Sequence, residues 1–211
     1  FEQKGNVRVH RINIPKHRSG MFDQIKAFIV YYLGAQKMAA RNDYDLVFAH
    51  EADAMKEQAE RVISWLKMME GESPYQISRL DHCLQTATRA EQDGADEETV
   101  VCALLHDIGD VIAPANHSQA AAALLRPYVS EKNYWIILNH GLFQGYYWMH
   151  HYDEDRNARD ALIDSPYYQA CVDFCAKWDQ TSFDPDFKAK PLEYFVPLIR
   201  RLFARTPGSH V

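Results

Sequence analysis

The sequence Leu105-His106-Asp107-Ile108-Gly109 carries more information about fold and chemistry than any other stretch. It places an imidazole beside a carboxylate in otherwise apolar, helical sequence. Neighbouring residues on a helix differ by about 100° in direction, so two of them can flank one ligand point only near its edge. Burying an aspartate in such sequence is costly unless it is paired or bound to a metal. Taken alone, the dipeptide fits a buried His-Asp hydrogen bond, a solvated pair at a helix end, or a metal site.

Helical periodicity extends over most of the chain. Apolar residues at three- and four-residue steps predict helices over Asp45–Glu70, Ile77–Gln92, about Asp96–Leu105, His117–Leu125, Glu131 to about His140, and Tyr167–Gln180. Only residues 7–14 (VRVHRINI) show the alternation of a strand. The predicted fold class is therefore all-α, without repeats or an internal linker.

Five consecutive segments each carry a histidine or an aspartate beside apolar residues, as a metal site in a bundle core requires. These residues are His82, His106, Asp107, His117, His140 and Asp179. Four imidazoles and two carboxylates are too many for one metal with an open position. They suit two cations that share a bridging carboxylate. Nitrogen and oxygen ligands without cysteine favour Fe, Mn, Zn or Ni.

Composition limits the class of protein. The 211 residues include 23 Lys and Arg against 29 Asp and Glu, a net charge of −6, and 47% are hydrophobic. This indicates a globular protein with one core and no basic face for nucleic acid. The longest apolar stretch, residues 27–33, is too short to cross a membrane, and no secretion signal is found. We therefore expect a cytoplasmic protein.

The ends of the chain and the cysteines add two expectations. Residues 1–20 are interpreted as a tag remnant or an N-terminal arm, and residues 21–211 as one domain. The four cysteines form no CxxC pair and are expected to be small buried side chains.

The order His82, His106-Asp107, Asp179 resembles the HD-domain superfamily over roughly residues 70–205. His117 and His140 extend the similarity to members with two metals. The resemblance implies a compact helical bundle with a dinuclear metal site in its core. It implies a first metal held by His82, His106, Asp107 and Asp179. The second would be held by Asp107, as a bridge, with His117 and His140.

Two chemistries use this ligand set in the superfamily. Most members are phosphohydrolases, and a smaller branch consists of mixed-valent di-iron oxygenases, such as myo-inositol oxygenase and the oxygenases that cleave hydroxylated aminophosphonates. The short chain, Glu70-Gly71-Glu72 and Leu84-Gln85 are more similar to the oxygenase branch. This resemblance implies two iron ions (Fe²⁺/Fe³⁺) and O₂ as co-substrate.

The residues around the predicted ligands bear on the substrate. Asp110 stands where many HD hydrolases carry lysine, and a carboxylate there would repel a phosphate. Gln144 and Ala176 stand where aminophosphonate-cleaving relatives carry basic residues. The sequence therefore favours a neutral or cationic hydroxylated substrate.

Roles follow for individual residues. We assign catalytic roles to Asp107, to Asp110 and to Tyr75, the last as a lid over the open iron. We assign substrate contacts to Gln144, Tyr147 and Lys177.

The leading hypothesis is an O₂-dependent di-iron oxygenase that cleaves a carbon–carbon or carbon–heteroatom bond of a small hydroxylated molecule. The alternative is a metal-dependent phosphohydrolase acting on a nucleotide or small phosphate ester. A third class, a non-enzymatic metal-binding protein, would have a closed site. The expected partner is a small-molecule substrate, with neither nucleic acid nor membrane, and the sequence indicates no particular oligomeric state.

Overall fold

The computed structural model describes residues 2–4, 7–9 and 57–208. By its internal contacts the chain divides into one unit of residues 1–52 and another of residues 53–211. In the first unit, β1 (Glu2–Lys4) pairs antiparallel with β2 (Val7–Val9). The predicted strand is thus confirmed over residues 7–9. The remainder of that strand, the predicted boundary at residue 20 and the first half of the helix predicted from Asp45 lie outside the described residues.

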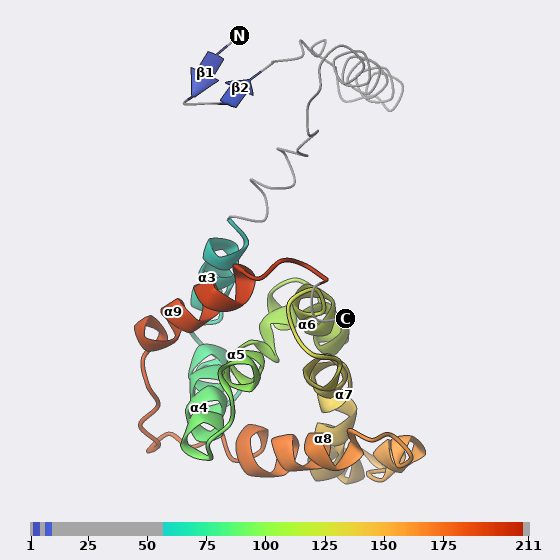
Figure 1. The fold of residues 1–211 in the computed structure, drawn as a ribbon. Helices are drawn as coiled ribbons and strands as arrows, with labels where there is room; N and C mark the ends of the chain where they lie inside the picture. The colour runs from blue at the N-terminus through green and yellow to red at the C-terminus, as the bar shows by residue number, and fades with distance from the viewer. Residues whose placement is uncertain (1, 5–6, 10–56, 209–211) are drawn as a thin grey trace, which may run out of the picture. The chain divides into compact units, whose positions relative to one another are not determined.

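The second unit is helical, which confirms the all-α class. Its α-helices are α3 (Gln58–Met68), α4 (Arg79–Gln92), α5 (Glu97–Leu105), α6 (His117–Leu125), α7 (Glu131–Trp148), α8 (Tyr168–Phe174) and α9 (Leu192–Phe203). Short 3₁₀ turns are η1 (Ile108–Val111), η2 (Pro114–Asn116), η3 (Met149–Tyr152) and η4 (Ala158–Leu162), and η5 (Cys175–Asp179) is π-helical. α4 packs along α5, α6 along α7 and α3 along α9 (Figure 1).

Polar caps fix where the helices that carry the candidate ligands begin. The Ser78 hydroxyl accepts the Asp81 N–H, and the Asp81 carboxylate accepts the Ser78 N–H, so α4 starts at Arg79 rather than at Ile77. The Asp96 carboxylate accepts the Thr99 N–H at 2.7 Å and starts α5. α6 has the predicted bounds.

α7 is longer than predicted, because Gly141 does not end it. An added Cβ at Gly141 would lie 2.6 Å from the Ser118 hydroxyl oxygen on α6. The glycine therefore serves the close approach of α6 and α7, and the helix continues to Trp148. The expectation that His140 closes this helix was wrong.

The helix predicted over Tyr167–Gln180 consists of two parts. α8 ends at Phe174 and passes directly into the π-helical turn η5, where the Gln180 N–H donates to the Cys175 carbonyl at 2.8 Å. Asp179, at the end of this turn, is 2% exposed. The wider turn thus delivers a carboxylate into the core.

The core is one contiguous cluster to which every α-helix of the second unit contributes. Its largest fully buried side chains include Leu104, Ile137, Phe143 and Phe195. All four cysteines are free and buried, as predicted. α9, which carries Phe195, was not predicted; its apolar residues recur at helical spacing, but Pro197 lies inside the pattern.

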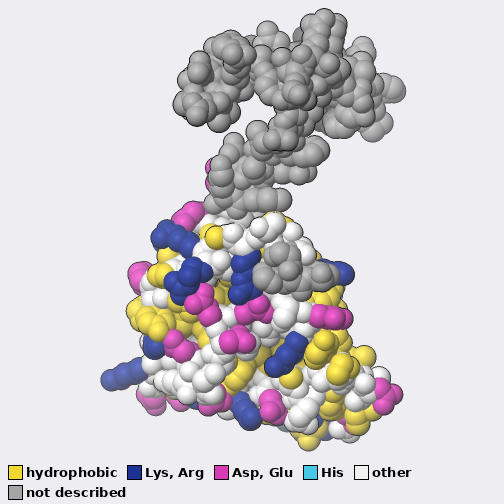
Figure 2. Space-filling view, viewed as in Figure 1, with side chains coloured by type: hydrophobic (Ala, Val, Ile, Leu, Met, Phe, Trp, Pro, Cys, Tyr) yellow, Lys and Arg dark blue, Asp and Glu magenta, His cyan; other side chains and the backbone are white. Residues whose placement is uncertain are grey.

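The surface carries charges of both signs. On the face in Figure 2, basic and acidic side chains are interspersed. Several are ion pairs between helices, including Arg200 with Glu60 and Arg201 with Glu97. Among the described helices, none combines the length and the apolar character needed to span a bilayer.

Candidate metal centre

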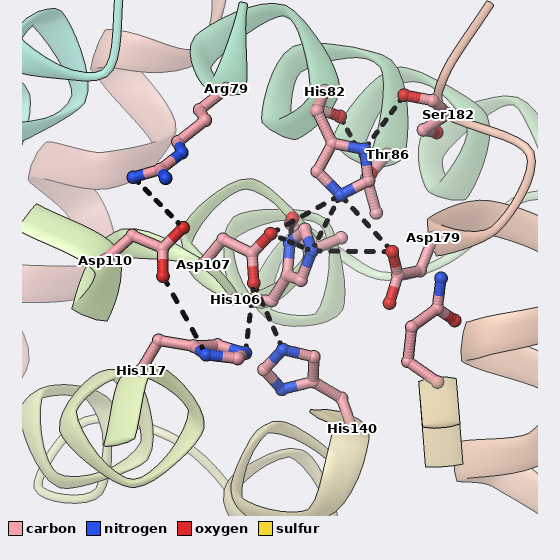
Figure 3. A network of polar contacts seen from close by, with 12 residues as sticks. Arg79, His82, Thr86, His106, Asp107, Asp110, His117, His140, Asp179 and Ser182 are labelled. Carbon is pink, nitrogen blue, oxygen red and sulfur yellow. Dashed lines mark hydrogen bonds and ion pairs between the residues drawn. The ribbon is translucent and has the colours of Figure 1, made fainter. Parts of the chain in front are cut away.

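Four helices and the turn η5 bring the six predicted ligands together around Asp107 (Figure 3). His82 lies on α4, His140 on α7, and His117 is the first residue of α6. His106 follows the last residue of α5, and Asp107 follows it in turn. This helix end is what lets the two adjacent side chains face the same point.

The two oxygens of Asp107 face different sets of imidazoles. Asp107 Oδ2 lies 3.5 Å from His82 Nε2 and 3.3 Å from His106 Nε2. Asp107 Oδ1 lies 3.5 Å from His117 Nε2 and 3.2 Å from His140 Nε2. Such an arrangement is that of a carboxylate between two cation positions.

Asp179 completes the group on the Oδ2 side. Its Oδ1 lies 3.2 Å from His82 Nε2 and 3.7 Å from His106 Nε2, and these two nitrogens are 3.1 Å apart. Ligand atoms about 2.1 Å from one ion are about 3.0–3.4 Å apart in octahedral or tetrahedral geometry. The observed separations therefore suit a common cation.

All four imidazoles are turned the same way. The Nδ1 atoms of His82, His106, His117 and His140 lie 2.8, 2.8, 3.2 and 2.7 Å from backbone carbonyl oxygens. A carbonyl only accepts, so each Nδ1 carries the proton and each Nε2 presents its lone pair to the carboxylates. Lone pairs facing carboxylate oxygens repel unless a cation lies between them. The donor set thus fits metal ions.

The charges around Asp107 favour the binding of a cation. Burial raises the pKa of Asp107, but His106, His140 and His82 outweigh it and hold the pKa well below its usual range. Burial lowers the pKa of His106, yet the charge of Asp107 and then of Asp179 raises it overall. The carboxylates therefore stay ionised and attract cations, whether protons or metals.

A family model described as the HD domain matches residues 79–165. Residues 79–165 are therefore similar to the HD domain. The match begins at the first residue of α4 and includes every predicted ligand except Asp179. No curated protein matches the chain. HD domains are typical of metal-dependent enzymes of the phosphohydrolase type, which agrees with the predicted resemblance for this region, and the oxygenase branch stays a prediction.

The segment that follows the matched residues 79–165 holds His82 in place. The Ser182 carbonyl accepts from His82 Nδ1, and Gln85 on α4 fixes this segment by donating to the Asp184 carbonyl at 2.7 Å and accepting its N–H at 3.3 Å. The Phe183 ring stacks on the His82 ring with centroids 4.3 Å apart. Residues 179–185 thus orient a candidate metal ligand.

Asp110 lies beside the cluster on the side of His117. Its carboxylate oxygens lie 3.8 Å from His117 Nδ1 and 3.5 Å from the Arg79 guanidinium. Burial, and then the charge of Asp107, raises the pKa of Asp110. The structure thus places next to the centre a third carboxyl group, and this one has a raised pKa, unlike Asp107.

Gln144 and Tyr147 follow His140 along α7 by one and two turns. Gln144 Nε2 donates to Gln180 Oε1 at 2.9 Å, while Gln144 Oε1 is buried without a hydrogen-bond partner in the described structure. Burial, and then Cys175, raises the pKa of Tyr147. Gln180 was not among the predicted site residues, although a polar residue directly after Asp179 was an available signal.

Two further predicted residues lie at the margin. Tyr75 is 57% exposed, and its ring lies 4.9 Å from the Phe183 ring, which in turn covers His82. Lys177 is not brought to the cluster, because its ammonium pairs with Asp173 at 3.0 Å on the surface.

Proposed function

We propose that this protein is an O₂-dependent non-haem di-iron oxygenase that cleaves a carbon–carbon or carbon–heteroatom bond of a small hydroxylated substrate. The proposal of two metals rests on Asp107, whose two oxygens face separate pairs of imidazoles. When bound, the iron pair would supply Lewis acidity toward the substrate hydroxyl and electrons for the activation of O₂.

The residues of the centre would have different roles. His82, His106 and Asp179 would hold one ion, His117 and His140 the other, and Asp107 both. Asp110 would take up the proton that the substrate hydroxyl loses, since its raised pKa makes it a better base than an ordinary carboxylate. Gln144 and Tyr147 would contact the substrate, and Tyr75 with Phe183 would limit the access of water.

One observation favours oxygenation over phosphate hydrolysis. The group beside His117 is the Asp110 carboxylate, and the nearest guanidinium, that of Arg79, is already paired with it. A phosphate dianion approaching the second ion would meet this negative charge at close range. A neutral or cationic hydroxylated molecule would not.

The second candidate is a metal-dependent phosphohydrolase, and the match to the HD domain supports it. The same cluster could then hold Mn, Co or Ni and activate water rather than O₂.

Metal analysis and EPR distinguish the oxygenase from the phosphohydrolase. Both are measured on anaerobically purified protein, before and after partial oxidation. About two irons per chain with a coupled signal below g = 2 are expected for the mixed-valent pair. Hydrolysis of phosphate esters under anaerobic conditions with Mn, Co or Ni, together with absence of the EPR signal, would instead support the hydrolase.

A further inference from the structure

Arg156 and Arg159 stack on the same tyrosine ring, which lies beyond the candidate ligand His140 on α7. The guanidinium carbon of each lies 3.9 Å from the centre of the Tyr146 ring. The two cations are therefore no further apart than twice that distance. Arg159 also lies 5.9 Å from the centre of the Phe143 ring. Aromatic faces thus hold both guanidinium planes in place.

The Arg159 guanidinium interacts with the Tyr168 hydroxyl, but three other nitrogens of the two groups lack acceptors. Nε of Arg156 and both Nε and Nη1 of Arg159 are buried, and none has a hydrogen-bond partner in the described structure. Within residues 57–208 neither side chain forms an ion pair, whereas Arg200, Arg201 and Arg205 each pair with a glutamate. Buried donors without acceptors are costly, so these three nitrogens favour the binding of an acceptor.

The carboxylates nearest in sequence are bonded to other groups. Asp160 accepts the Tyr168 hydroxyl at 2.6 Å, and Asp155 accepts the Asn157 N–H at 2.8 Å. Asp153 and Glu154 are exposed, where solvent screens their charge. The positive charge of the two guanidinium groups therefore stays uncompensated within the segment.

We propose that Arg156 and Arg159 form a binding site for an oxyanion, which is a phosphate, sulfate or carboxylate group. Guanidinium groups donate parallel N–H bonds that match the paired oxygens of such anions. Stacking on Tyr146 fixes the donors in advance, so little side-chain entropy is lost on binding. The site lies outside the metal ligands and does not depend on the proposed oxygenase activity.

Calorimetric titration with inorganic phosphate tests the site in the full-length protein. Arg159→Met and Arg156→Met each keep an unbranched stem against Tyr146 and remove the donors. Each is expected to weaken phosphate binding about 10- to 100-fold, the range for lost charged hydrogen bonds. Arg126→Met is the matched control, because Arg126 also stacks on a tyrosine, at 4.9 Å from the Tyr134 ring centre. It should bind phosphate as the wild type does.

Two further variants distinguish this site from the metal centre and from a loss of folding. His82→Ala should retain phosphate affinity, since the metal centre is not the site proposed here. Arg159→Lys keeps the charge without the planar fork, so it should bind with intermediate affinity and have an unchanged melting temperature.

The source of the anion is tested with glycerol phosphate. If glycerol phosphate binds more tightly than inorganic phosphate, the natural ligand is a phosphate group on an organic molecule. If the two bind equally, the natural ligand is the free anion. The proposal is overturned if wild-type protein binds none of phosphate, sulfate and acetate. It is also overturned if the Arg159→Met protein binds as tightly as wild type, or if His82→Ala abolishes binding.

Discussion

Glu98 joins three helices, and its removal gives the sharpest test of how they pack. On α5, its Oε1 accepts the Ser130 N–H at 2.7 Å, at the start of α7, and the Asn133 side-chain amide at 2.9 Å. Its other oxygen accepts from Arg205, just after α9. The side chain is 15% exposed. We therefore expect Glu98→Gln to be far more costly than a change to a surface glutamate.

The size of the effect follows from the pKa. Burial raises the pKa of Glu98, but the bonds from Ser130, Arg205 and Asn133 lower it from 4.5 to about 2. At about 1.4 kcal/mol per pKa unit, the folded state gains about 3 kcal/mol from the ionised carboxylate. Because the folded pKa is depressed, this gain is complete above pH 4.5 and is lost as the pH falls toward 2.

Urea unfolding followed by circular dichroism, at several pH values between 7 and 3, measures the difference. Glu98→Gln should lower the free energy of unfolding by about 3 kcal/mol at pH 7, and by progressively less below pH 4.5. Glu97→Gln is the control, because its pair with Arg201 is exposed and worth at most about 1 kcal/mol. Equal losses in the two variants, or a Glu98 effect that does not shrink in acid, would refute the reasoning.

Three further predictions concern the centre and its support. His82→Ala should lose iron and O₂-dependent turnover together, whereas His117→Ala should retain about one iron per chain by elemental analysis, since it leaves the other ligand set intact. Asp110→Asn should keep both irons but lower turnover about 100-fold, as for loss of a general base; unchanged turnover would remove Asp110 from the mechanism. Gly141→Ala should destabilise the fold by about 1–3 kcal/mol in thermal unfolding, because its Cβ would meet the Ser118 hydroxyl.

The cluster could be predicted because its polar and charged side chains are energetically costly to bury in apolar helical sequence. Imidazoles and carboxylates such as His106 and Asp179 occur in apolar helical sequence, and burial there requires a partner. The helix start at Asp96 was predicted as well, since capping is a local interaction, whereas the Ser78 cap was overlooked and α4 was predicted to begin at Ile77. The fold class followed from periodicity alone.

The features that could not be predicted depend on contacts between segments that are distant in the sequence. Gly141 can be taken as a helix end, and only the approach of α6 shows that it serves packing. The π-helical turn before Asp179 has no sequence signature in the residues 175–179. The pairing of Gln144 with Gln180 joins residues on different elements, so spacing along the chain does not indicate it.

Three of the four imidazoles are oriented locally, and one is not. His106, His117 and His140 each donate from Nδ1 to a carbonyl three residues earlier, so their orientation is fixed with their own turn. His82 instead donates to Ser182, 100 residues away. The first metal position therefore depends on a loop that the second does not need.

The Gln85 side chain bonds this loop to α4. Gln85→Ala should therefore make the orientation of His82 less fixed without replacing a candidate ligand. Loss of such an outer contact lowers metal affinity about 10- to 100-fold. Chelator competition should therefore show one weakened ion and one of unchanged affinity. Thr88→Ala is the control, since the Thr88 hydroxyl also bonds the returning chain, but at Lys190, beyond the loop. If both variants weaken one ion equally, or if Gln85→Ala weakens both ions, His82 is not held through this loop.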